Sequence, residues 1–451
     1  MPDLSRIVKA YDVRGVVPDE LDADIARAIG AAFARFTGAE RIVVARDMRE
    51  SGVELGRAFA EGATAQGVDV VDAGQGSTDL LYYAAGTLDV PGAMFTASHN
   101  PAKYNGIKLC LAGARPVGQE TGLAQVRAEA ERFLDEGLPS GDRTGTVTSQ
   151  DLLDGYAAYM KDLVPGIGQI RPLKVVVDAG NGMGGLTVPR TFVGLPLEVE
   201  QMYFELDGSF PNHEANPIDP ANTADLQARV RETGADLGLA FDGDADRCFV
   251  IDERGEIVSP SVLTALIASR ELAKDPGGTV IHNLITSRAV PEVVTEAGGT
   301  PVRTRVGHSF IKAEMARTGA VFGGEHSGHF YFRDFWNADS GMLAALHTLA
   351  ALGTSDGTLS ELLSTYSRYA ASGEINSTVA DSPAKVAELK ERYTAAGLDE
   401  LDGLTVDLGD GAWFNVRASN TEPLLRLNVE APDVPTMERV RDEVLAVIRA
   451  Q

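Results

Sequence analysis

The alternation of short apolar runs with longer stretches of helical periodicity constrains this chain most strongly. The run RIVVA at residues 41–45 has the length and composition of a strand, residues 52–66 favour a helix, and residues 68–72 favour another strand. Such alternation is typical of proteins in which helices cover a sheet that contains parallel strands. The sequence therefore predicts the α/β class.

Breaks in this pattern divide the chain into several units. A length of 451 residues is too great for one hydrophobic core. Gly, Ser, Thr and Pro gather at 137–149, Ser259 and Pro260 suit the N-cap and first position of an apolar helix at 261–274, and residues 353–358 form a loop before a strand-rich tail. We predict four domains, at residues 1–148, 149–256, 257–366 and 367–451.

Charge and composition exclude several classes of partner. The formal net charge of −25 weighs against nucleic acid and anionic membranes, and no apolar stretch reaches the length needed to cross a bilayer. The N-terminal residues lack the apolar core of a secretory signal, and two cysteines, Cys110 and Cys248, are too few for a disulfide framework. We expect a cytoplasmic protein with no nucleic-acid partner and no membrane partner.

The segment FDGDADR, residues 241–247, suggests a metal site. It places Asp242, Asp244 and Asp246 between two apolar runs of strand type, ADLGLA and CFVID. Three carboxylates this close repel one another, and a hard cation such as Mg²⁺ relieves the repulsion. A solvated acidic turn is the simpler alternative.

An EF-hand loop is a further alternative, because it also begins with alternating aspartates and ends on an acidic residue, here Glu253. Its sixth position requires glycine, whereas this chain has Arg247, and its flanks are helices. The segment therefore fits a metal-binding turn between strands, with positions left for phosphate oxygens.

The segment TASHNPAKYNGIK, residues 96–108, supplies a candidate phosphate carrier. We expect Ser98, beside His99 at the end of an apolar strand, to be exposed and open to phosphorylation. Lys108 would then act as a proton shuttle or as a charge clamp. The alternative is a turn capped by side-chain hydrogen bonds.

Two further polar segments suit a sugar phosphate. In GGEHSGH, residues 323–329, Glu325 and Ser327 can bind vicinal hydroxyls, and the glycines permit close approach. In RASNTEP, residues 417–423, an arginine, two hydroxyls and an amide suit a phosphate.

Together these segments resemble the α-D-phosphohexomutase family, in its bacterial phosphomannomutase/phosphoglucomutase branch, over the whole chain. The resemblance implies four domains in a heart-shaped arrangement: three similar α/β domains with mixed sheets and a smaller C-terminal α+β domain. They would carry, in order, the phosphoserine, metal, sugar-recognition and phosphate-binding loops.

The resemblance also implies residue roles. Phosphorylated Ser98 would carry the phosphoryl group and complete the Mg²⁺ shell of Asp242, Asp244 and Asp246. The remaining catalytic candidates are His99, Lys108, Arg247 and His329. Substrate binding would fall to Tyr11 and Arg14 of the motif YDVRG, and to Gly307, His308, Glu325, Ser327, Arg417, Ser419, Asn420 and Thr421.

The implied reaction moves phosphate between O6 and O1 of a hexose, mannose and/or glucose, through a hexose 1,6-bisphosphate that also serves as activator. We expect a monomer or weak dimer. Phosphoglucosamine mutases usually have loops closer to GEQSG and RPSGTEP, so Asn420 favours the hexose branch. A metal-dependent phosphatase with a serine nucleophile and a catalytically silent sugar-phosphate binding protein are competing interpretations of the same residues.

Overall fold

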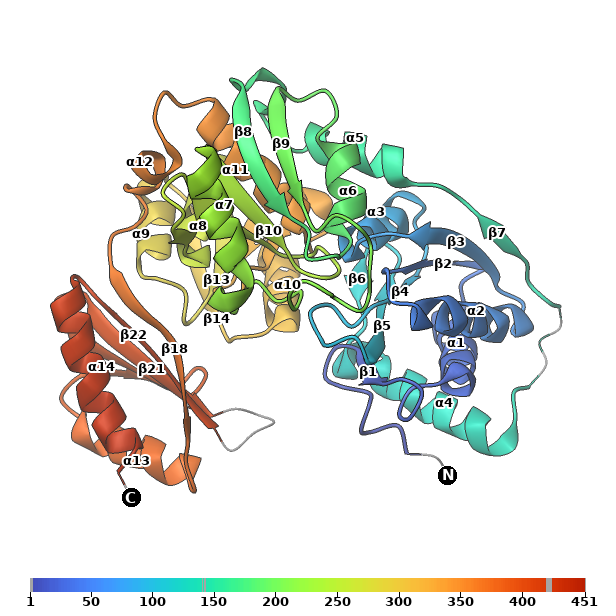
Figure 1. The fold of residues 1–451 in the computed structure, drawn as a ribbon. Coiled ribbons are helices and arrows are strands. Elements are labelled where there is room, and N and C mark those ends of the chain that lie inside the picture. Colours follow the sequence, from blue (N-terminus) through green and yellow to red (C-terminus); the bar gives the residue numbers. More distant parts are fainter. Residues whose placement is uncertain (1–2, 140, 142, 419–423, 451) are drawn as a thin grey trace. The chain divides into compact units, whose positions relative to one another are not determined.

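The computed structural model describes residues 3–139, 141, 143–418 and 424–450. The chain divides into two compact units. Figure 1 labels helices and strands of both. Unit 1 contains residues 1–259 and 327–362, and unit 2 contains residues 260–326 and 363–451. No helix within the described ranges is long and apolar enough to span a membrane.

Unit 1 begins with a mixed sheet of strand order β1-β5-β4-β2-β3-β7, with β6 beside β5. Strand β2 pairs in parallel with β3 and β4, whereas β5 is antiparallel to β1 and β4. The strands are β1 Val13–Val16, β2 Arg41–Arg46, β3 Asp69–Gln75, β4 Gly92–Phe95, β5 Tyr104–Leu111, β6 Arg115–Pro116 and β7 Val147–Ser149. The helices are α1 Ala23–Thr37, α2 Ser51–Ala65, α3 Thr78–Thr87 and α4 Leu123–Glu136.

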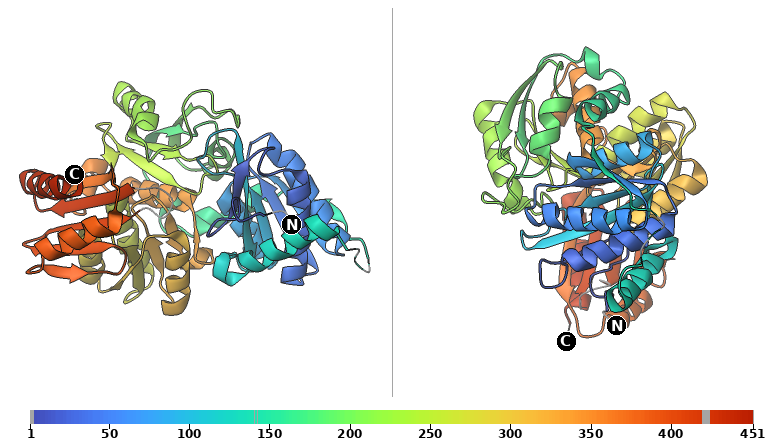
Figure 2. Two further views of the ribbon diagram at one scale, coloured as in Figure 1. Left: turned by 90° about the horizontal axis from the view of Figure 1, so that it is seen from below. Right: turned by 90° about the vertical axis from the view of Figure 1, so that its right-hand side faces the viewer.

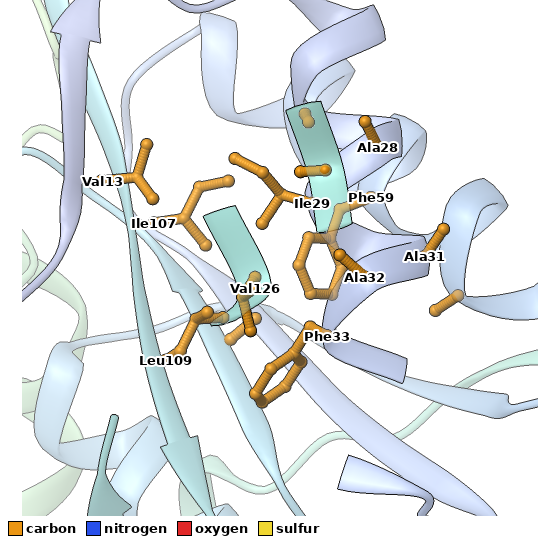
Figure 3. Packing of buried hydrophobic residues seen from close by; sticks show 14 of the residues in the cluster. Val13, Ala28, Ile29, Ala31, Ala32, Phe33, Phe59, Ile107, Leu109 and Val126 are labelled. Atoms are coloured by element: carbon orange, nitrogen blue, oxygen red, sulfur yellow. The ribbon is translucent and has the colours of Figure 1, made fainter. Parts of the chain in front are cut away.

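The core of this first domain lies between the sheet and helices α1, α2 and α4 (Figure 3). Phe33 and Phe59 of the helices pack toward Ile107 of β5. Helices α1 and α2 lie side by side (Figure 2) at very short range, since a Cβ atom on Gly30 would collide with the Phe59 carbonyl. This packing supports β4 and β5, the strands that flank Ser98.

A second mixed sheet of unit 1 has the strand order β12-β11-β10-β8-β9. Strand β8 is parallel to β9 and β10, and β10 is antiparallel to β11. The strands are β8 Leu173–Asp178, β9 Leu197–Met202, β10 Leu237–Phe241, β11 Cys248–Asp252 and β12 Ile257–Val258, and the helices are α5 Leu153–Asp162, α6 Gly184–Thr191 and α7 Ala224–Thr233. The acidic segment therefore joins two strands and not two helices, as predicted, and the structure shows that these strands are antiparallel.

The last part of unit 1 carries the antiparallel pair β16 Phe330–Phe332 and β17 Ala338–Asp339, followed by α11 Gly341–Gly353. A buried carboxyl, Asp79 of α3, ties this part to the others by accepting hydrogen bonds from Tyr156 Oη at 2.9 Å and Ser340 Oγ at 2.6 Å. Burial raises the pKa of Asp79 to about 7, although these hydroxyls oppose the shift. Helix α12 Leu359–Leu363 follows.

Unit 2 contains a parallel group of strands and a separate antiparallel sheet. Strand β13 is parallel to β14 and β15, and the C-terminal sheet has the order β18-β22-β21-β20-β19. The strands are β13 Thr279–Asn283, β14 Thr300–Thr304, β15 Phe322–Gly324, β18 Ala370–Thr378, β19 Gly397–Asp399, β20 Leu404–Gly409, β21 Ala412–Ala418 and β22 Leu424–Ala431. The helices are α8 Pro260–Lys274, α9 Ala289–Glu296, α10 His308–Thr318, α13 Ser382–Arg392 and α14 Val434–Ile448.

These elements confirm the α/β class, the mixed sheets and the smaller C-terminal α+β portion. The predicted helix at 52–66 is α2, shifted by one residue, and α8 begins at Pro260 as expected. The strand predicted at 68–72 is β3, which starts one residue later and extends to Gln75.

Candidate active site

The serine loop, residues 96–104, follows β4 and leads into the antiparallel strand β5. Ser98 has a left-handed backbone conformation, φ 48°, and its amide donates to Thr96 Oγ1 at 2.9 Å. Its residue surface is 5% exposed, so the prediction of an exposed serine is wrong. The reason is a long-range contact: the acidic loop, residues 242–247 between β10 and β11, packs over the serine loop.

The acidic loop meets Ser98 directly. Ser98 Oγ donates to Asp242 Oδ2 at 2.9 Å, although 144 positions separate the two residues. Gly243 makes this approach possible, because a Cβ atom there would lie 2.5 Å from the Ser98 carbonyl oxygen. The two loops that the sequence singled out thus form one site.

The three aspartates converge within this loop, and all three are buried. Carboxylate oxygens of Asp242, Asp244 and Asp246 lie within 4.8 Å of one another. Lys108 Nζ donates to Asp244 Oδ2 at 2.8 Å and to Asp246 Oδ2 at 2.7 Å. Thr78 Oγ1, which sequence reasoning missed, donates to Asp244 Oδ2 at 2.5 Å.

Two carboxylate oxygens of this acidic group have no hydrogen-bond donor among the described residues. Asp244 Oδ1 and Asp246 Oδ1 are buried and have no hydrogen-bond partner among the described residues. Buried anionic oxygens without a donor are costly, and a hard divalent cation such as Mg²⁺ is the partner that oxygen ligands favour. The residues present therefore fit a divalent metal ion.

Burial and charge set the protonation of the aspartates. Burial, with Asp246 and Asp244 nearby, raises the pKa of Asp242 to about 8 against the opposing charge of Arg247. Burial also opposes ionisation of Asp246, but Lys108 and His329 outweigh it and hold the Asp246 pKa at about 2. A bound cation would favour the ionised form of all three.

The pKa of Lys108 lies well above its usual value. Burial alone would lower this pKa, yet the charges of Asp244 and Asp246 prevail. Lys108 is therefore an ammonium ion at neutral pH.

Three basic residues lie near Ser98: Arg247, His99 and Arg14. Arg247 Nε donates to Asp242 Oδ2 at 2.9 Å, and Arg247 Nη2 lies 2.5 Å from His99 Nδ1. The same ring nitrogen lies 3.2 Å from Ser98 Oγ. Burial, together with Arg247 and Arg14, lowers the pKa of His99 to about 3, so the ring is neutral. Arg14 Nη1 donates to Asn100 Oδ1 at 2.6 Å, and Tyr11, three residues before Arg14, is exposed.

His329, in the last part of unit 1, lies near the acidic loop. Its Nε2 lies 3.9 Å from Asp246 Oδ1, and its Nδ1 lies 3.1 Å from Ser327 Oγ. Potential ligand atoms of His329, Asp246 and Asp339 lie within 4.8 Å of one another. His329 is therefore placed beside the acidic group, with one ring nitrogen held by a hydroxyl.

Unit 2 gathers a second set of predicted residues. The buried Glu325 accepts from the Gly307 amide at 3.3 Å and from Asn283 Nδ2 at 3.5 Å, and His308 starts α10 immediately after Gly307. Arg417 of β21 lies 3.5 Å from Glu374, and burial lowers its pKa. Ser419, Asn420 and Thr421 lie outside the described residues.

Comparison with known proteins agrees with this geometry. Four phosphoglucomutase/phosphomannomutase domains match the chain in order: alpha/beta/alpha domain I at residues 5–133, alpha/beta/alpha domain II at 155–255, alpha/beta/alpha domain III at 259–369 and the C-terminal domain at 374–447. The chain belongs to the phosphoglucomutase/phosphomannomutase family.

Individual relatives of this family cover nearly the whole chain. A phosphomannomutase of Escherichia coli K12 is 40% identical over 445 residues, which are 95% of this chain and 96% of that protein. A phosphomannomutase/phosphoglucomutase of Pseudomonas syringae pv. tomato is 39% identical over 450 residues, covering 98% and 94%. The crystal structure of a family protein from Burkholderia thailandensis superimposes with a TM-score of 0.87 at 35% identity, covering 100% of this chain and 98% of that one. Both the fold and the family expected from the motifs are confirmed.

Proposed function

We propose that this chain is a phosphohexomutase, an isomerase that interconverts hexose 6-phosphate and hexose 1-phosphate of mannose and/or glucose. The observation that carries the proposal is the 2.9 Å hydrogen bond between Ser98 Oγ and Asp242 Oδ2. It joins a candidate phosphate carrier to a buried carboxylate group suited to a cation. Relatives with phosphomannomutase and phosphoglucomutase names support the same reaction class.

In the proposed reaction, phosphorylated Ser98 donates its phosphoryl group to the free hydroxyl of a bound hexose phosphate. The Oγ–P bond breaks, the sugar O–P bond forms, and a hexose 1,6-bisphosphate results. After the bisphosphate turns over in the site, Ser98 takes back the other phosphoryl group. The net reaction consumes no phosphate. Because the bisphosphate can give a phosphoryl group to Ser98, it would also serve as an activator of unphosphorylated enzyme.

The residues around Ser98 supply charge and proton transfer. Arg247, which is bonded to Asp242, and the ammonium group of Lys108 lie where they can stabilise the phosphoryl oxygens. His329 is the candidate that takes the hydroxyl proton, since Ser327 holds its other nitrogen. His99 is neutral and accepts from Arg247, which suits an orienting role.

Asp242, Asp244 and Asp246 would hold Mg²⁺, with an oxygen of phosphorylated Ser98 as a further ligand. When bound, a divalent cation there neutralises charge on the phosphoryl oxygens. Asp244 Oδ1 and Asp246 Oδ1 are two buried oxygens that have no hydrogen-bond donor among the described residues, and they support this assignment.

Other predicted residues would recognise the sugar phosphate. Glu325 and Ser327 would bind sugar hydroxyls, while Arg417, with Ser419, Asn420 and Thr421, would bind the phosphate. Arg14 would face the phosphoserine, and Tyr11, Gly307 and His308 would line the substrate path. Domain boundaries at 148/149, 256/257 and 366/367 would place one loop on each domain.

We also propose that the chain acts in the cytoplasm, as a monomer or weak dimer. The two cysteines, Cys110 and Cys248, are buried and are not joined in a disulfide, which suits a reducing compartment.

The decisive experiment is incubation with glucose 1,6-bisphosphate, followed by intact-mass analysis and peptide mapping. We expect a mass gain of one phosphoryl group on Ser98, and no gain in Ser98→Ala. Coupled assays should show turnover of mannose or glucose phosphates by the wild type and a loss of at least about 10³-fold in Ser98→Ala.

The competing functions give different results in the same experiment. Stoichiometric release of inorganic phosphate would indicate a phosphatase, and preference for glucosamine phosphate would indicate the glucosamine branch. A Ser98→Ala variant with normal turnover would refute the phosphoserine scheme.

A further inference from the structure

Arg49, a residue outside the four motifs, lies beneath the serine loop. It follows β2 in the segment RDMRES and is 2% exposed. Its guanidinium contacts the backbone of the serine loop and one carboxylate, Asp47. The loop and Arg49 all belong to unit 1.

All five N–H groups of this guanidinium have acceptors. Nη2 donates to the carbonyl oxygens of Ser98 at 2.9 Å and Asn100 at 2.7 Å. Nη1 donates to those of Pro101 at 3.0 Å and Tyr104 at 2.9 Å. Nε donates to Asp47 Oδ2 at 3.2 Å. Because an arginine side chain has five N–H donors, none remains for a ligand.

This saturation separates Arg49 from the arginines assigned to phosphate. Within the described ranges, the buried Nε atoms of Arg14 and Arg417 have no hydrogen-bond partner. Those two side chains can still donate to an incoming anion, whereas Arg49 can do so only by releasing the serine loop.

The other contacts of Arg49 fix its own position. Asp47 Oδ1 accepts from the Arg49 amide at 2.9 Å, and the guanidinium carbon lies 5.1 Å from the ring centroid of Phe210. A Cβ atom on Gly208 would lie 2.8 Å from the Arg49 Cα, so the segment before Phe210 packs against the arginine backbone. Arg49 is therefore held by the loop that follows β2 and by the loop that follows β9.

The serine loop needs such support because Ser98 has a positive φ, which is unfavourable for a residue other than glycine. Its amide is held by Thr96 Oγ1, and its carbonyl is held by Arg49. With both ends of the residue fixed, Oγ is directed toward Asp242 Oδ2.

We infer that Arg49 is a positioning residue that sets the direction of Ser98 Oγ by holding four carbonyl oxygens of the serine loop. The inference rests on the proposed function, since the aligned atom is the phosphoryl carrier. It assigns Arg49 no contact with substrate. Arg49→Lys should therefore lower kcat and leave KM nearly unchanged, because lysine keeps the charge but cannot match the planar five-donor pattern.

The test compares Arg49→Lys with Arg27→Lys in the coupled mutase assay. Arg27 of α1 pairs with Glu61 and Asp24 and provides the same substitution in the same domain. We expect kcat of Arg49→Lys to fall about 10²-fold, with KM for hexose 6-phosphate within about threefold of wild type. Arg27→Lys should keep both parameters.

Hydrogen exchange supplies a readout that does not depend on activity. In Arg49→Lys, peptides covering 96–104 should exchange about tenfold faster, while peptides covering 23–37 should match wild type. If thermal unfolding shows that Arg49→Lys does not fold, Thr96→Val replaces it. That variant removes the acceptor of the Ser98 amide and should lower kcat about tenfold without raising KM.

Three results would overturn the inference: unchanged kcat with unchanged exchange at 96–104, an increase in KM alone, or an equal loss of kcat in Arg27→Lys. The proposed function is judged separately on the wild type. If wild-type protein takes up no phosphate from glucose 1,6-bisphosphate, the phosphoserine scheme fails, and the exchange experiment still decides whether Arg49 holds the loop.

Discussion

The serine and acidic loops of unit 1 differ from the proposed recognition residues of unit 2 in how their charged groups are paired. In unit 1, Lys108 bonds to two carboxylates and Arg247 to a third. In unit 2, Arg417 lies 3.5 Å from Glu374 and has a buried Nε without a partner among the described residues. Charged groups that are already paired with one another are preorganised to stabilise the charge that develops during a reaction. A hydrogen-bond donor without a partner in the protein, in contrast, gains its partner when a ligand binds.

This difference predicts that the two regions affect different kinetic parameters. Substitutions in the unit 1 centre should act mainly on kcat, since in the proposed reaction its groups would contact the phosphoryl group during transfer. Substitutions in unit 2 should act mainly on KM, because under the proposed function the partners of these residues would be substrate atoms, bound in both the ground state and the transition state.

The largest expected effect is that of Lys108→Met. Loss of an ammonium that contacts Asp244 and Asp246 should lower kcat by roughly 10³-fold, within the range for acid–base and electrostatic groups. It also leaves buried carboxylates without their cation, so the free energy of unfolding without metal should fall by about 3–5 kcal/mol.

Saturating Mg²⁺ should restore most of that stability but not the turnover, because the metal can replace the charge of Lys108 among the carboxylates and not its proposed contact with the phosphoryl oxygens. Thermal unfolding with and without Mg²⁺, alongside steady-state kinetics, measures both effects. Metal that restores turnover would show that Lys108 contributes charge alone. Exposed Lys390, which pairs with Glu400, provides the matched control Lys390→Met.

An intermediate effect is expected for Arg417→Ala. Loss of a charge-assisted hydrogen bond to phosphate costs about 1.5–3 kcal/mol, so KM should rise by roughly 10- to 100-fold with a smaller change in kcat. The rise should be similar for the 1-phosphate and the 6-phosphate, since one phosphate site must accept both ends of the sugar. Arg439→Ala, on the exposed surface of α14, is the control.

Calorimetric titration of each sugar phosphate into Arg417→Ala tests the same point at equilibrium. Weakened binding of one isomer alone would contradict reorientation through this site, and a loss confined to kcat would contradict the contrast between the two units.

The sequence predicted those parts of the site whose residues lie close together in the chain. Asp242, Asp244 and Asp246 are close in the chain, and the strands on either side of them follow from local apolar runs. The exposure of Ser98 was mispredicted because its cover comes from residues 144 positions away. Thr78 and Arg49 have no local signature, since each acts on a partner brought near by the tertiary fold.

Long-range geometry also determines the protonation of His99. A histidine next to a serine suggests a base, yet burial, Arg247 and Arg14 lower its pKa to about 3. None of these influences can be read from the residues adjacent to it. Pattern therefore identifies candidate loops, while the charge state of each group depends on the completed fold.

The smallest expected effect concerns an ion pair of unit 1 that lies outside the serine and acidic loops. His213 Nε2 lies 2.9 Å from Asp178 Oδ2, and its Nδ1 lies 2.9 Å from the Glu214 carbonyl. Burial opposes the charged ring, but Asp178 and this carbonyl outweigh it and raise the pKa of His213 above its usual value. The resulting stabilisation is complete below the unfolded-state pKa of about 6.5 and is lost as pH rises through the folded-state pKa.

His213→Gln should therefore lower the free energy of unfolding by roughly 1–2 kcal/mol at about pH 5.5, and the difference should be smaller at about pH 8. Urea unfolding of both proteins at the two pH values measures it. The kcat and KM should remain those of wild type, because the pair touches neither the serine loop nor the acidic carboxylates. A pH-independent difference would mean that His213 packs as a neutral ring. A loss of kcat would show that the reaction depends on the pair at the end of β8. The buried charges that support the fold would then not be separable from those that support the reaction.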